Sequence, residues 1–300
     1  MGRKIILNGR EYIGGGEDVS GIVDSLNTTE QTPRNIADVL AEELARIAEN
    51  ILQPNAEIDN SASHNAIYRG KYLGTAVTAE QYSAINDGTF KDLFIGDYWT
   101  INGVNWRIAH FDYWLNTGDT NCTTHHVVIV PDTNLYNAQM NSENPTTGGY
   151  YNSAMRGGAN YPTGGNLANA KTAIDNAFGS SHILSHREIL TNAISSNIPS
   201  GWDWYNSTVD LMSEVMAYGH HAWSANGGDG SGFETGIDHE QLALFRHDHS
   251  RICTRAHWWL RGCHNLQSFA IVNANGRADY AHSVNYSLGV RPAFAIRGGV

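Results

Sequence analysis

The sequence predicts an α+β domain of short strands and a few helices, preceded by an N-terminal appendage of strand, linker and helix. Three observations lead to this fold class. Only 16% of the 300 residues are charged, and 31 are glycine, a composition typical of loop-rich β-containing proteins. Residues 94–109 show the pattern of a β-hairpin. Residues 33–52 show the pattern of one amphipathic helix.

The N-terminal appendage is expected to cover residues 1–60. A short strand at 4–8 is followed by a glycine-rich linker around residues 14–16. Thr32 and Pro33 supply a helix start, and apolar residues recur every three or four positions up to Pro54. The apolar stripe suits packing on the same domain, or a short coiled coil that forms a homo-oligomer such as a trimer.

The main domain is expected to cover residues 61–300. Its strongest local pattern is the hairpin around Asn102 and Gly103, and further strands are predicted at 125–130, 269–272 and 290–296. Because Pro292 has no N–H to donate, we expect the last strand to be at an edge or bulged. Helices are predicted at 167–178, after Ser185 from residue 186, and after Ser207 through Leu211 and Met216, and Asn275-Gly276 predicts a turn.

Charge and cysteine content narrow the function classes. The net charge is −11, which gives no electrostatic basis for binding nucleic acid. There is no apolar run of bilayer length and no signal-peptide pattern at the N-terminus, so we expect neither a membrane partner nor secretion by a standard signal. Cys122, Cys253 and Cys263 have no metal-ligand or disulfide-framework spacing, so free thiols are expected.

The C-terminal third carries a recognisable series of motifs. These are Trp258-Trp259-Leu260-Arg261, Phe269-Ala270-x-Val272, Gly276-x-Ala278 and Gly289-Val290-Arg291-Pro292-Ala293-Phe294. The series resembles the C-terminal region of C-type-lectin-fold bacteriophage proteins, including the variable proteins of diversity-generating retroelements, the major tropism determinant group. The hairpin with residues 95–98, the stretch 125–132 and residues 137–141 are also similar to phage structural proteins, so the resemblance spans about residues 66–296.

The resemblance implies a variable ligand-binding region at about residues 251–288. In that family, adenine-directed mutagenesis of asparagine codons diversifies exposed positions on a fixed scaffold. Between Gly262 and Leu288 there is no Lys, Glu, Met or Trp, the types that such codons cannot produce, although Gln267 needs another codon. The predicted ligand-binding residues are Cys263, His264, Asn265, Leu266, Ser268, Ile271, Asn273, Asn275, Arg277, Asp279, Tyr280, His282, Asn285, Tyr286 and Leu288.

The predicted surface has the chemistry of an antibody combining site. Tyr and His offer flat contact area at little entropic cost, and Asn and Ser adapt their hydrogen bonds. Trp258, Trp259 and Phe269 are expected to lie beneath as core. An ordinary polar surface loop is the alternative interpretation of the same stretch.

Metal and catalytic alternatives are weaker. The histidine pairs, among them His125-His126 and His220-His221, lack the second half of a metal motif, and neighbouring strand residues face opposite ways. Glu143-Asn144-Pro145 has the composition but not the order of a lectin sugar-binding tripeptide, and Asp229 and Asp238 lack EF-hand spacing. We expect no catalytic residue, metal or other cofactor.

The leading function is therefore a phage virion protein, made in the bacterial cytoplasm and displayed on the particle. It would bind a host-cell surface protein or glycan and contact other virion proteins. A purely structural head or tail decoration protein is the first alternative. A catalytic domain like formylglycine-generating enzymes is a remote one, because that chemistry needs a pair of active cysteines, whereas Cys253 and Cys263 are ten residues apart.

Overall fold

The computed structural model describes residues 4–7, 10–13, 59–142, 155–196, 198–224, 240–265, 267–281 and 283–299. The chain divides into two compact units, Met1–Glu57 and Ile58–Val300. In the first unit, β1 (Lys4–Leu7) pairs antiparallel with β2 (Arg10–Ile13), which confirms the predicted first strand. The predicted linker and the helix at 33–52 lie outside the described residues.

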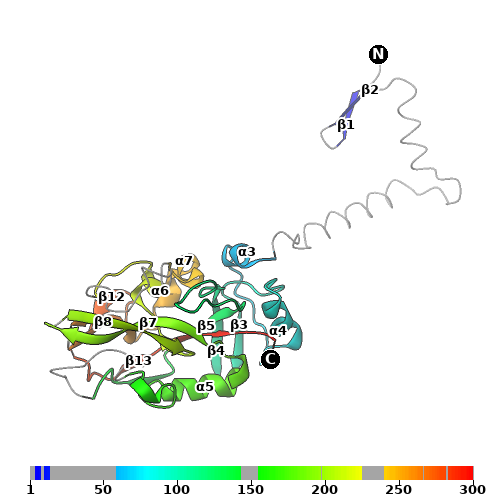
Figure 1. The fold of residues 1–300 in the computed structure, drawn as a ribbon. Helices are drawn as coiled ribbons and strands as arrows, with labels where there is room; N and C mark the ends of the chain where they lie inside the picture. Colours follow the sequence, from blue (N-terminus) through cyan, green and yellow to red (C-terminus); the bar gives the residue numbers. More distant parts are fainter. Residues whose placement is uncertain are drawn as a thin grey trace. The chain divides into compact units, whose positions relative to one another are not determined.

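The second unit mixes many short strands with few helices, so the α+β prediction is confirmed at this level (Figure 1). Its strands are β3 (Tyr98–Ile101), β4 (Val104–Phe111), β5 (Val127–Pro131), β6 (Tyr136–Ala138), β7 (His186–Ser195), β8 (Ile198–Ser207), β9 (Asp210–Leu211), β10 (Trp258–Asn265), β11 (Ser268–Val272), β12 (Ala278–Tyr280), β13 (Leu288–Val290) and β14 (Pro292–Ile296). Its helices are α3 (Ser61–Asn65), α4 (Ala79–Asn86), α5 (Ala168–Phe178), α6 (Glu214–Tyr218) and α7 (Ala243–His247), with 3-10 turns η1 (Gly158–Asn160), η2 (Ser180–His182) and η3 (His249–Ile252).

One five-stranded sheet has the order β3-β4-β5-β14-β9. It begins with the predicted hairpin, in which Trp99 lies opposite Trp106 and the turn residues Asn102 and Gly103 both have positive φ. Positive φ at both turn positions matches the strand twist, which is why Asn-Gly is favoured there. The predicted strand at 125–130 and helix at 167–178 are confirmed as β5 and α5.

A second five-stranded sheet has the order β12-β11-β10-β13-β6. The chain passes from this sheet into the first one at Arg291, between β13 and β14. The expectation for Pro292 is wrong: β14 pairs with both β5 and β9, so it is an inner strand. Pro292 is tolerated because it is the first residue of that strand.

The predicted helix after Ser185 is wrong, because residues 186–195 form β7 and pair with β8 in a two-stranded ribbon (Figure 1). The burial along β7 alternates from His186 to Leu190, with His186, Glu188 and Leu190 buried. That period of two belongs to a strand. The β-branched residues of β7 and the aromatic residues of β8 also favour pairing over a helix.

The predicted helix after Ser207 is also wrong in its start. Ser207 is buried and donates to the carboxylate of Asp210, while β9 pairs with β14. The helix α6 begins only at Glu214, where Ser213 is the cap and accepts a hydrogen bond from the Met216 N–H at 3.1 Å. Asp210 and Leu211, which were predicted to be helical, therefore form a strand that pairs with β14.

The core between the elements is rich in aromatic residues. Phe178 of α5 lies edge-on to Trp106, with ring centroids 5.7 Å apart, and Phe294 of β14 packs against both. Such pairs add to the stabilisation from burial. Among the helices that the structure describes, none combines the length and the apolar character needed to cross a membrane.

Candidate ligand-binding surface

The strands β10 to β13 carry the predicted ligand-binding residues on a rigid floor. Trp258, Trp259 and Phe269 are fully buried, as predicted. Each indole N–H has a partner, with Trp258 donating to the Ile252 carbonyl at 3.2 Å and Trp259 to the Ala138 carbonyl at 2.8 Å. Buried tryptophans with satisfied N–H groups fix the strands that hold the surface.

Three predicted residues belong to this floor and not to the surface. Cys263, Ser268 and Ile271 are buried, so the expectation that they contact a ligand is corrected: their side chains do not reach solvent. Every residue of β11 is buried, as are the first six of β10, so both faces of these strands are covered at these positions. Burial also raises the pKa of the Cys263 thiol to about 12, which keeps it protonated.

Two predicted residues join a third that sequence reasoning missed. His264 at the end of β10 and Tyr280 in β12 have ring centroids 4.6 Å apart, and Trp223 lies 5.7 Å from His264 and 4.7 Å from Tyr280. The imidazole Nδ1 of His264 lies 2.6 Å from the Trp223 carbonyl oxygen. We call Trp223, His264 and Tyr280 the aromatic cluster; Trp223 is 36% exposed and the other two are partly exposed.

A buried carboxylate positions Trp223. Glu214, the first residue of α6, accepts hydrogen bonds from the backbone N–H groups of Ala222, Trp223 and Ser224 and from the Ser224 hydroxyl, at 2.6–3.2 Å. These bonds compensate the loss of water around a fully buried acid. In the sequence, Trp223 lies between a His-His pair and a glycine-rich stretch. A tryptophan among such polar and flexible residues is the sequence feature that could have indicated a surface position.

A second group of predicted residues forms the turn between β11 and β12. The Asn273 side-chain oxygen accepts from the N–H groups of Asn275 and Arg277, at 3.0 and 3.1 Å. Gly276 has φ +81°, as the predicted turn requires. The turn exposes Asn275 and Arg277, while Asp279 is partly buried and accepts from the Asn273 amide.

A third group lies near the start of β13. Asn285 and Tyr286 are exposed, and the Tyr286 side chain is 47% exposed. Leu288 and, in β10, Asn265 are partly buried. Leu266 and His282 lie outside the described residues.

The predicted residues do not form one continuous surface. Tyr280 lies in β12 at one edge of the sheet, whereas Leu288 lies in β13, next to β6 at the other edge. The strands β11 and β10 separate the two. The predicted ligand-binding residues are neighbours in the sequence, but the fold separates them into at least two exposed groups.

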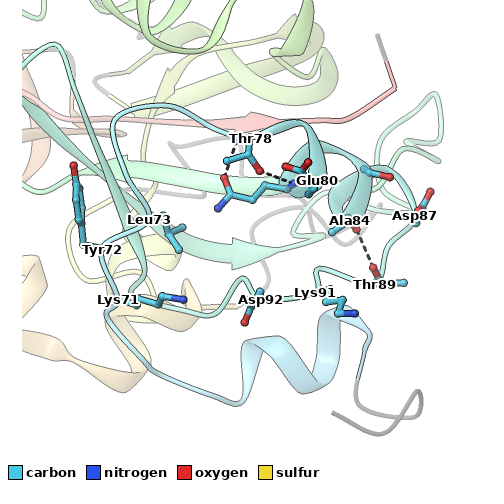
Figure 2. A pocket seen from close by; sticks show the side chains of 12 residues that line it. Lys71, Tyr72, Leu73, Thr78, Glu80, Ala84, Asp87, Thr89, Lys91 and Asp92 are labelled. Atoms are coloured by element: carbon cyan, nitrogen blue, oxygen red, sulfur yellow. Dashed lines mark hydrogen bonds between the residues drawn. The ribbon is translucent and has the colours of Figure 1, made fainter. Parts of the chain in front are cut away.

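A cavity of about 610 Å³ lies elsewhere, between residues 71–73 and α4 (Figure 2). The side chains of Lys71, Asp92 and Lys91 follow one side, and Thr78 and Glu80 at the helix start lie opposite. Its walls thus carry both charge signs, and no predicted residue lines it. We assign it no ligand class.

In the described parts of the chain, no group of three or more His, Cys, Asp or Glu side chains is arranged so that it could hold a metal ion. His125 and His126 lie just before β5 and not within a strand; the first side chain is 39% exposed and the second is buried. Both contact Asp112, since His125 Nδ1 lies 2.8 Å from the carboxylate and the His126 N–H donates to it. The three cysteines are free thiols, as predicted.

A match to a protein-family model overlaps this surface. Residues 211–298 match a family model described as a domain of unknown function, DUF6273. The match covers α6, the aromatic cluster, the complete β10–β13 region and β14. No curated protein and no solved structure matches the chain.

Proposed function

We propose that the chain is a tailed-phage virion protein whose residues 61–300 form a C-type-lectin-like domain that binds a host-cell receptor or glycan. The observation that carries the proposal is the aromatic cluster. Three partly exposed rings from three separate chain segments come together, with ring centroids 4.6–5.7 Å apart. Rigid aromatic groups of this kind dominate binding surfaces because they bury much area at little entropic cost.

The arrangement supports recognition and offers little for catalysis. The thiol of Cys263 is buried with a raised pKa, and Cys253 contacts the Ala274 carbonyl at 3.3 Å. The N-terminal unit, in this proposal, attaches or oligomerises the protein on the particle, and several copies would convert weak contacts into firm adhesion.

Cell binding tests the proposal. The labelled full-length chain is incubated with candidate host bacteria and compared with a Trp223→Ala, Tyr280→Ala double variant. Trp202→Ala is the matched control, because Trp202 in β8 is 37% exposed against 36% for Trp223. Thermal melting checks that all three proteins are folded.

Loss of cell binding only in the cluster variant supports the proposal. Equal binding by that variant overturns the assignment of the aromatic cluster. Absence of binding by the unmodified chain to any candidate host overturns the receptor role and favours structural decoration.

A further inference from the structure

A groove of about 420 Å³ lies at the β6 edge of the second sheet, opposite the β12 edge that carries Tyr280. Its volume falls within the range of about 300–1,000 Å³ typical of small-molecule sites. Three segments build it: β6 with Gln139, the start of α5 with the residues before it, and the turn before β13. The described lining residues are Tyr136, Asn137, Ala138, Gln139, Gly165, Asn166, Asn169 and Ser287.

Hydrogen bonds hold the walls of the groove together. The Tyr136 hydroxyl donates to the Asn166 carbonyl at 2.6 Å and accepts from the Ala170 N–H at 3.1 Å. The Asn166 amide donates to the Gln139 carbonyl at 2.6 Å, and the Gln139 amide donates to the Asn285 carbonyl at 2.7 Å. The groove is therefore preorganised, which lowers the entropic cost of binding.

Some side chains that line the groove still have hydrogen-bonding groups available. Asn137 and Asn169 are exposed, and their side chains make no hydrogen bond with the described part of the chain. Each amide offers a donor and an acceptor side by side, and the Ser287 hydroxyl adds both functions. A ligand with closely spaced hydroxyl groups matches this pattern, because each hydroxyl also donates and accepts.

The groove is also uncharged. None of its described lining residues is Asp, Glu, Lys or Arg, in a chain that has 49 such residues. A charged ligand would lose water without gaining an ion pair there, which is unfavourable. An anionic ligand would also meet the repulsion of a chain with net charge −11.

We infer that this groove is a second binding site, specific for an uncharged oligosaccharide. The partly buried ring of Tyr136 is the aromatic group among the described lining residues. The inference does not rest on the proposed receptor role, because the groove shares no residue with the aromatic cluster. It assigns uncharged oligosaccharides as the ligand class of the β6 edge of the sheet.

Calorimetric titration of the full-length chain tests the inference. The probes are the neutral oligosaccharides lactose, maltotriose and chitotriose, with sialyllactose and a heparin hexasaccharide as charged probes and an uncharged peptide pool as the third class. The Asn137→Ala, Asn169→Ala double variant removes the two exposed amides that line the groove. Asn121→Ala, an exposed asparagine on the loop before β5, is the matched control.

The expected result is saturable binding of at least one neutral oligosaccharide, weakened about tenfold or more in the double variant and unchanged in Asn121→Ala. Binding of the charged probes or the peptide pool alone overturns the ligand class. No binding by any probe, or equal binding by the double variant, overturns the site. The aromatic-cluster variant separates the two proposals, since it should keep its oligosaccharide binding.

Discussion

The inner positions of the β12-β11-β10-β13-β6 sheet differ in burial from the positions displayed at or near its edges, and residues 258–288 contribute to both groups. In the centre, Trp258, Trp259 and Arg261 are almost fully buried. Near the edges, Tyr280 in β12 is partly exposed, and Tyr286, just before β13, is 47% exposed. The difference shows that a stretch with the composition of a variable loop contains scaffold and display positions in close succession. Substitutions in the centre should cost stability, and those at the edges should cost binding alone.

The largest loss of stability is expected for Glu188→Gln, which removes an ion pair to Arg261 in the centre of the sheet. Glu188 in β7 and Arg261 in β10 are each 1% exposed, with Oε2 and NH2 3.2 Å apart. Burial alone would raise the pKa of Glu188, but the charges and hydrogen bonds of Arg261 and His186 outweigh it and lower that pKa. The substitution removes the buried counterion of Arg261, at a cost of about 3–5 kcal/mol.

Urea unfolding followed by tryptophan fluorescence measures this effect. Asp87→Asn, at the exposed C-terminal end of α4, is the control and should keep the wild-type midpoint. A Glu188→Gln midpoint equal to that of the control would show that the centre does not depend on this ion pair.

Sequence reasoning found the elements with local signals. The Asn102-Gly103 hairpin, the helix α5 and the strand β11 each carry their own period and turn or cap chemistry. The prediction failed where pairing between strands determines the secondary structure. Ser185 resembles a helix cap in the sequence, but the residues after it form β7 because they pair with β8.

The candidate site was predictable only in part, for the same reason. His264 and Tyr280 were found because they lie in the stretch that resembles a variable region. Trp223 was missed because its place beside them depends on the buried Glu214, more than 40 residues before His264. The burial of Cys263 and Ile271 depends on the β10–β11 register, which composition does not encode.

A second prediction concerns the effect of pH on stability, which should depend on the buried side chain of His126. His126 is fully buried, and burial lowers its pKa from 6.5 to about 4, against the opposing effects of the Thr124 carbonyl and Asp112. His186 and His110 also act to lower the pKa of His126. Because the unfolded chain takes up a proton on His126 at higher pH than the folded chain does, the contribution of His126 to stability is largest above about pH 6.5. It should fall by roughly 3 kcal/mol as the pH drops to about 4.

Melting temperatures between pH 4 and pH 8 check this expectation. In His126→Gln, which cannot titrate, the slope in this window should be smaller. An unchanged slope would assign the pH dependence to another group.

A third prediction distinguishes scaffold from display inside the variable stretch. Gly276 has φ +81°, and a methyl group there would lie 2.8 Å from the Cβ of Cys253. Gly276→Ala should therefore cost about 1–3 kcal/mol, from backbone strain and crowding. Gly103→Ala is the matched control, since Gly103 has φ +78° but nothing within 4 Å. Chemical denaturation should place the Gly276 variant clearly below the Gly103 variant, and equal midpoints would show that the turn has room to adjust.

The smallest effect on stability is expected for the displayed positions. Asn275, Arg277 and Tyr286 are exposed, and exposed side chains without special contacts usually change stability by about 0.5 kcal/mol or less when replaced. Replacing each by serine should leave the melting temperature near that of the unmodified chain. A loss as large as that of Gly276→Ala at any of the three would mean that this position also supports the fold. A surface position can vary in sequence only where replacing its side chain leaves the fold stable. These three melting curves therefore test whether the amino acids at the displayed positions can vary.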